Sequence, residues 1–281
     1  MSTGGGYINK IMIDSRFKTQ SSASNTNFTL ELNENIQLPD RTGCIITDVV
    51  IPRTWYAVNS TNNRLYLSIT KVSNGGTEYH IAYLNTQNYT LFNMALGIVA
   101  AINTATNADY FNATPDPNTG KIKLSIKDST VQSFNICTDA DLRTRCNQTW
   151  RGPYYNNTNL LSINPVLRND GVQPMQQYTA NTPFYTGVVD LIGIHTIYIT
   201  SSSLTTYNNI GSRGERNILK KVLCSVGFGE LILENTFLDK DYTDVSNRPL
   251  KTIDFRVVDV YGNDIDLNGG HVSFSLLFVS I

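Results

Sequence analysis

Apolar side chains recur at every second position in many short segments of this chain. The pattern occupies residues 28–32, 65–69 and 122–126, where the intervening residues are polar or charged. The last such segment carries one apolar phase made of Val272, Phe274, Leu276 and Phe278. A period of two places successive side chains on opposite faces of an extended chain, so each segment predicts a half-buried β-strand.

The number and spacing of these segments predict an all-β fold. Roughly 8–10 strands follow one another at short intervals, which favours a single jelly-roll β-sandwich with about eight core strands in two sheets. Residues 44–52 are apolar on both phases, as in a central strand covered on both faces. Residues 188–200 and 221–226 are predicted as further strands, and Tyr79, Ile81 and Tyr83 as the inward phase of another.

Helical periodicity is strong in one place only. Residues 90–103 carry a broad apolar face with Thr90 or Asn88 as the N-cap; this face contains Leu91, Phe92, Ala95, Leu96, Ile98, Val99 and Ile102. A weaker helix is predicted to begin at Thr158 and to be cut by Pro165. No composition change marks a boundary, so residues 1–281 are predicted as one domain, with a flexible arm over 1–10 and an inserted loop region over 151–184.

Composition narrows the classes of partner. Charged residues make up 16 % of the chain, against about 25 % in typical soluble domains, and the net charge is −1. The basic residues form no stripe, so no specific nucleic-acid partner is expected. No secretory signal and no membrane-spanning run are expected either. The cysteines (Cys44, Cys137, Cys146 and Cys224) have no C-x-x-C spacing, and the better interpretation is buried free thiols in a reducing compartment.

The strongest metal-like motif fails at its last ligand. Asp264, Asp266, Asn268 and Gly269 match the first half of an EF-hand loop, but Ser275 stands where the bidentate Glu is needed. A polar turn is therefore preferred to a calcium site. His80, His195 and His271 are far apart in sequence; His80 and His271 are predicted to face solvent on strands. We expect no catalytic residues, no metal and no cofactor, because no nucleophile, base and acid occur in a recognisable pattern.

The 15 tyrosines point to binding rather than chemistry. Many lie in Asn-rich loops, such as the pair Tyr154 and Tyr155. Such rings can stack on sugars, as in a β-sandwich lectin, or can anchor a contact between subunits. The absence of a fixed spacing favours the subunit contact, and a carbohydrate- or receptor-binding module remains the alternative function.

Two segments resemble a known family. The first, residues 13–69, opens with IDSR and contains an L-P-D turn and the strand exit VIPRTWY. The second, residues 254–278, holds a strand pair joined by GNDIDLNG. In this order and position the motifs resemble the penton (minor capsid) proteins of virophages, Polinton/Maverick elements and polinton-like viruses. The matched ends cover about a third of the chain.

The resemblance implies a structural role and no enzymatic activity. It implies a single jelly roll that forms a homopentamer at an icosahedral vertex and contacts trimers of the double-jelly-roll major capsid protein. The protein would be located in the virion and assembled in a cytoplasmic viral factory of the host. A vertex spike and an internal membrane are left open as further contacts.

The last strand is expected to carry a subunit contact. A closed ring joins two different faces of each subunit, so some outward strand positions should be apolar. Beyond Ser275 the second phase of the last strand becomes apolar, at Leu277, Val279 and Ile281. We predict that these three residues are covered by a neighbouring subunit, by the N-terminal arm or by the inserted loops.

Overall fold

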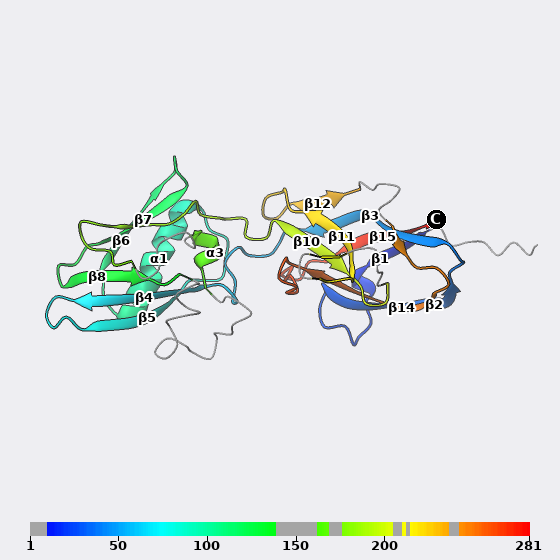
Figure 1. Ribbon diagram of the computed structural model, residues 1–281, viewed down its shortest axis with the longest axis horizontal. Coiled ribbons are helices and arrows are strands. Elements are labelled where there is room, and N and C mark those ends of the chain that lie inside the picture. Colours follow the sequence, from blue (N-terminus) through cyan, green and yellow to red (C-terminus); the bar gives the residue numbers. More distant parts are fainter. Residues whose placement is uncertain (1–9, 139–161, 169–175, 205–209, 212–213, 236–241) are drawn as a thin grey trace, which may run out of the picture. The chain divides into compact units, whose positions relative to one another are not determined.

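The computed structural model describes residues 10–138, 162–168, 176–204, 210–211, 214–235 and 242–281. Its residues divide into two compact units. We call residues 1–55 with 194–281 the sandwich unit, and residues 56–193 the inserted unit. The elements are coloured along the chain in Figure 1.

The strands of the sandwich unit are β1 (Lys10–Asp14), β2 (Asn27–Gln37), β3 (Thr42–Pro52), β10 (Thr196–Thr200), β11 (Ile218–Leu223), β12 (Leu231–Glu234), β13 (Thr243–Asp244), β14 (Pro249–Val258) and β15 (Ser273–Ser280), with the short 3-10 helix η1 (Ser15–Phe17). Those of the inserted unit are β4 (Arg64–Lys71), β5 (Thr77–Tyr83), β6 (Phe111–Asp116), β7 (Lys121–Ile126), β8 (Val131–Ile136) and β9 (Phe184–Tyr185), with the helices α1 (Leu91–Thr106) and α3 (Asn164–Leu167).

The sandwich unit is a jelly roll. Sheet A has the order β1-β15-β3-β12, with β13 added to β3, and sheet B has the order β11-β10-β14-β2. All pairings are antiparallel. Leaving out β13, eight strands divide equally between the two sheets, and the chain passes from one sheet to the other at every step except between β10 and β11, which is the jelly-roll arrangement. The predicted all-β jelly-roll sandwich is therefore confirmed.

The core of the sandwich lies between the two sheets. Phe274 and Leu276 of β15 and Ile46 of β3 pack in one cluster with Ile199 of β10 and Phe255 of β14. The predicted inward phase of the last strand is confirmed, because Val272, Phe274, Leu276 and Phe278 are all buried. Residues 44–52 form the inner strand β3, as the doubly apolar pattern predicted.

The inserted unit has a hydrophobic core of its own. Helix α1 packs against β5 and β6, and its N-cap is Thr90, whose side chain accepts a hydrogen bond from the Asn93 N–H. The sheets β5-β4-β8 and β6-β7-β9 supply the other walls. The predicted single domain thus separates into two units, since residues 56–193 bury their apolar faces against one another. The sequence pattern could not show this division, because strands of period two occur in both units.

Several local predictions need correction. Only 196–200 of the strand predicted over 188–200 is extended, because the Asp190 carboxylate accepts hydrogen bonds from the N–H groups of Ile192 and Gly193 and closes a turn there. Pro165 lies in the first turn of α3 rather than at the end of a helix, where its fixed φ and missing N–H are tolerated. Residue 10 does not belong to the predicted arm, because Lys10 is the first residue of β1, and the rest of the predicted arm lies outside the described residues.

The inward faces of β5 and α1 also differ from prediction. In β5, Tyr79 and Tyr83 are about half exposed, while Ala82 is buried opposite Leu65. Tyrosine is amphipathic, so an alternating sequence pattern does not show whether its side chain faces the core or the solvent on an edge strand. In α1, Phe92 and Leu96 are exposed, since a helix packed on one side buries only a stripe of its surface.

Among the residues that the structure describes, no helix has the length and apolar character needed to cross a bilayer.

Candidate assembly surface

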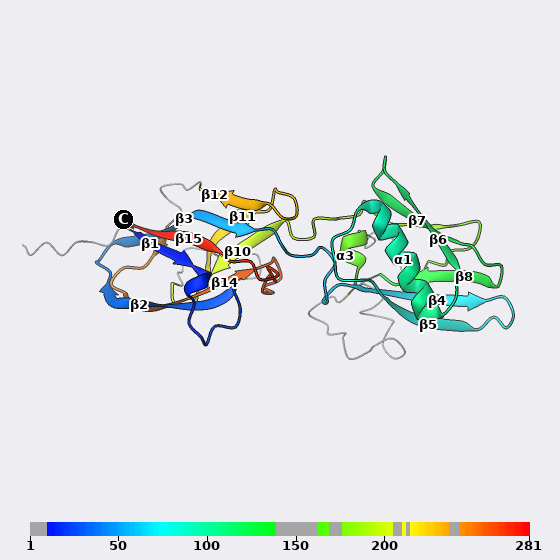
Figure 2. The same ribbon diagram turned by 180° about the vertical axis from the view of Figure 1, so that it is seen from behind.

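The outer face of sheet A carries the residues that the sequence singled out. Core residues alternate with outward residues along β15, so Ser273, Ser275, Leu277 and Val279 lie on the outer face. Leu277 pairs with Ile45 of β3 on one side and with Lys10 of β1 on the other. Figure 2 shows β1 beside β15 in this sheet.

The three predicted contact residues share one end of this face. Leu277 and Val279 are half-buried, and Ile281 is 36 % exposed. Val279 pairs with Gly43 of β3. A Cβ at Gly43 would lie 2.8 Å from the Ile281 Cγ2 atom, so the glycine allows the C-terminal residue to lie across β3. Tyr154 and Tyr155, the other predicted contact residues, fall outside the described residues.

Further apolar side chains lie on the same face, on the two edge strands β12 and β1. Leu231 and Leu233 of β12 are 52 % and 71 % exposed, and Leu233 pairs with Val50 of β3. Met12 of β1 is 81 % exposed and pairs with Ser275. Sequence reasoning missed these residues, although the alternation in Leu231–Glu234 is the signal that could have found them. We call the whole set the outer patch: Met12, Val50, Leu231, Leu233, Leu277, Val279 and Ile281.

A polar band crosses this face between Leu277 of β15 and Leu233 of β12. It contains Thr47, Ser275 and an ion pair in which the Lys10 ammonium donates to the Asp48 carboxylate at 2.5 Å. Asp48 sits where the register between β3 and β15 shifts, with φ of 53°, as in a β-bulge. The hydrogen bond from Lys10 holds the pKa of Asp48 below its ordinary value. Exposed leucines beside a polar band are typical of a surface that contacts another protein.

Replacing Asp48 with asparagine is expected to lower the free energy of unfolding by less than about 1 kcal/mol at pH 7, because the Lys10–Asp48 pair is exposed and solvent screens it. Asparagine tolerates a positive φ, so the change isolates the charge. A carboxylate whose folded pKa is depressed stabilises the fold above about pH 4, and this contribution is lost as the pH falls through the folded pKa. Denaturant titrations of both proteins should therefore converge in acid; a difference that grows below pH 4 would contradict the assignment.

The half calcium loop is a hydrogen-bonded turn. The Asp264 carboxylate accepts from Asn27 and from the Arg256 guanidinium, and the Asp266 carboxylate accepts from the Asn268 N–H. The segment borders a surface hollow of about 480 Å³. Within the described ranges, no three His, Cys, Asp or Glu side chains form a group that could hold a metal.

The histidines and cysteines do not form a common site. His271 is exposed, as predicted, and its Nδ1 atom lies 3.4 Å from the Ser15 hydroxyl. His80 was predicted to face solvent, but it is half-buried opposite Leu67, because the inward phase of β5 is the one that carries Ala82. Cys44, Cys137 and Cys224 are free and buried, whereas Cys146 lies outside the described residues. Burial raises the pKa of the Cys44 thiol to about 12, which keeps it protonated.

Comparison with known proteins supports the fold. No protein-family model matches this sequence, and no curated protein matches it. Among solved structures, the selenomethionine-labelled mavirus penton protein is similar, with a TM-score of 0.53 and 10 % sequence identity. The likeness covers 97 % of this chain and 99 % of the other. The chain therefore has a penton-like fold over nearly its whole length.

Proposed function

We propose that this protein is a structural capsid protein, a penton that forms homopentamers at the icosahedral vertices of a virophage-like or polinton-like virion. The observation that carries the proposal is the penton-like fold, which includes the inserted unit as well as the jelly roll. The sequence motifs in residues 13–69 and 254–278, which resemble penton proteins, support it independently. The role is structural rather than catalytic.

The outer patch is the surface that we assign to the pentamer contact. A closed ring with an odd number of subunits needs a heterologous interface, so the patch contacts a different surface of the next copy. The exposed side chains of Met12, Leu231 and Leu233 supply apolar area that water solvates poorly. The ion pair between Lys10 and Asp48 gives the contact a polar centre that can select one orientation.

The proposal also assigns a location and further partners. In the virion the pentamer contacts trimers of the double-jelly-roll major capsid protein, and assembly takes place in the host cytoplasm. A vertex spike and an internal membrane are further contacts that this position allows. Cryo-electron microscopy of particles from the source virus tests the location, since density for this chain should occupy the five-fold vertices.

The mass of the purified protein in solution is the direct test of the pentamer. Five times the chain mass of 31.3 kDa is about 157 kDa. Light scattering after size-exclusion chromatography should give that mass for the protein alone, or a complex that contains five copies of it when it is mixed with the major capsid protein. A chain that stays monomeric in both conditions and is missing from particle vertices would contradict the proposal.

The variants Leu233→Asp and Val279→Asp are expected to abolish the pentamer, because each buries a carboxylate in the subunit contact. Leu233 is mostly exposed in the single chain, so its replacement should change the unfolding free energy by no more than about 0.5 kcal/mol. Val279 is half-buried, so its replacement should also lower the unfolding free energy of the single chain. Sedimentation velocity reports assembly, and thermal unfolding reports the fold.

Val72→Asp serves as the matched control, because Val72 is 59 % exposed in a turn of the inserted unit, outside the outer patch. This variant should assemble as the parent does. A stable pentamer of Leu233→Asp and Val279→Asp would show that the contact lies elsewhere.

A further inference from the structure

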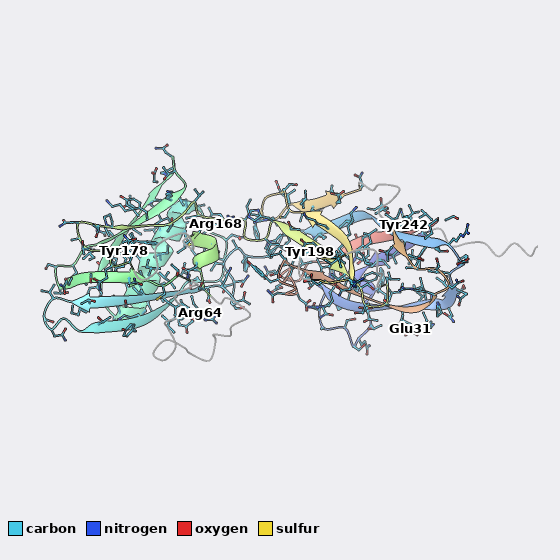
Figure 3. The ribbon with its side chains drawn as sticks, in the orientation of Figure 1. Glu31, Arg64, Arg168, Tyr178, Tyr198 and Tyr242 are labelled. Carbon is cyan, nitrogen blue, oxygen red and sulfur yellow. The ribbon has the colours of Figure 1, made fainter. Side chains whose placement is uncertain are left out.

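A small hollow on the outer face of sheet B has the chemistry of a binding site. It has a volume of about 100 Å³ and takes its walls from β10, β11, β14 and the adjoining turns. Its principal side chains are Tyr198, Glu215, Asn217, Ile218, Arg256 and Val258. Tyr198 is labelled in the sandwich unit in Figure 3.

Three polar groups in this hollow are left for a ligand. The Tyr198 hydroxyl, the Asn217 side-chain amide and the Arg256 Nη1 atom have no hydrogen-bond partner among the described residues. The other nitrogens of Arg256 are occupied: Nε donates to the Asp264 carboxylate at 2.9 Å, and Nη2 donates to the Gly262 carbonyl at 3.2 Å. Together the three groups offer several donors and two acceptors within one small space.

The local charge argues against an anionic ligand. The Arg256 guanidinium is neutralised by Asp264, at 2.7 Å from its Nη2 atom. The Asp259 carboxylate accepts hydrogen bonds from the N–H groups of Tyr261 and Asn263, and Glu215 adds another negative charge. A phosphate, sulfate or carboxylate would therefore meet no net positive charge. A neutral ligand with several hydroxyl groups can use the same donors and acceptors without that penalty.

The size of the hollow and the ring of Tyr198 narrow the class of ligand further. The hollow is smaller than the roughly 300–1,000 Å³ of sites that enclose drug-sized molecules, so it holds a single small ring that stays partly in water. The apolar side chains of Ile218 and Val258 line the hollow together with Tyr198, whose ring has an apolar face and a polar tip. A pyranose fits these surroundings, because it has an apolar face and hydroxyl groups around its rim.

We propose that this hollow binds one neutral sugar residue, such as the terminal hexose of a cell-surface or virion glycan. Its residues are held on paired strands: Tyr198 pairs with Val258, and Thr200 pairs with Arg256 and donates to the Arg256 carbonyl at 3.3 Å. This backbone pairing preorganises the binding groups. The site does not depend on the pentamer and adds an attachment function to the structural one.

Saturation-transfer difference NMR on the full-length protein tests the site with the methyl glycosides of glucose, galactose, mannose and N-acetylglucosamine at millimolar concentration. We expect saturation transfer to at least one of them, and weaker or no transfer to N-acetylneuraminic acid. Tyr198→Ala should lower the affinity about tenfold, since the stacking surface is lost. Tyr198→Phe keeps the ring and should have a smaller effect. Asn217→Ala should also weaken binding.

Tyr185→Ala is the matched control, because Tyr185 is a half-exposed tyrosine on β9 of the inserted unit and does not line this hollow. It should bind as the parent does, and circular dichroism should show that all variants remain folded. The proposal is overturned if no neutral sugar binds, if only the anionic sugar binds, or if folded Tyr198→Ala binds unchanged. A pentamer that binds no sugar would leave the capsid proposal standing, so the two can fail separately.

Discussion

Replacing Phe255 with alanine is expected to lower the free energy of unfolding of the sandwich unit by about 3–5 kcal/mol. Phe255 is fully buried, and its ring centroid lies 5.7 Å from that of Phe28 in sheet B and 5.0 Å from that of Phe274 in sheet A. The side chain therefore joins the two sheets. Removing it leaves a cavity that the flanking strands cannot close, because their register is held by backbone hydrogen bonds.

Phe134→Ala is the counterpart in the inserted unit. Its ring lies 4.9 Å from that of Phe111 and 5.4 Å from that of Tyr178, and Tyr178 contacts Phe184 in turn. The core clusters around Phe255 and Phe134 share no residue. Each substitution should therefore shift its own transition in a calorimetric or denaturant scan. A single transition that moves equally in both variants would show that the two units unfold together.

A chain in which residues 56–193 are replaced by a short Gly-Ser linker is expected to fold as a jelly roll on its own. The insertion lies between β3 and β10, and both sheets of the sandwich are built entirely from strands outside it. Its two ends are close together, since a Cβ on Gly193 would lie 3.3 Å from the Ala57 Cα atom. A short linker can therefore join Trp55 to Ile194 with little loss of loop entropy.

The isolated segment 56–193 should fold as well, because it buries its own core. Circular dichroism, amide dispersion in NMR spectra and a cooperative thermal transition measure both products. The excised chain carrying Phe255→Ala is the negative control and should lose its transition. If the excised chain is unfolded while the parent is stable, the sandwich depends on the inserted unit, and the division into independent units is wrong.

The sequence predicted well those structural features that depend on residues close together in the chain. The helix N-cap, predicted at Thr90 or Asn88 and found at Thr90, and the inward phase of Val272–Phe278 depend on side chains a few residues apart, and both predictions are confirmed. The phase of β5 was wrong because Tyr79 and Tyr83 satisfy either side of an edge strand. The turn at Asp190 was missed because it depends on a carboxylate reaching backbone N–H groups, which hydrophobic alternation does not report.

In the candidate surfaces, too, the sequence predicted the local features and missed those that depend on strand pairing. Leu277, Val279 and Ile281 could be singled out because they interrupt a polar phase within one strand. Their association with Leu233 and Met12 depends on the strand order β1-β15-β3-β12, which joins residues more than 200 positions apart. Tyr198 and Arg256 likewise meet only because β10 pairs with β14.

The sequence by itself determined that this chain forms half-buried strands, because a period of two is a property of neighbouring residues. It also determined the β-sandwich class and the one long helix. Only the tertiary structure decided which strands pair, and hence that eight of them form a jelly roll while residues 56–193 form a second unit. The physical reason is that strands with the same alternation are interchangeable locally. Their partners are selected by packing over long sequence distances, which no local pattern encodes.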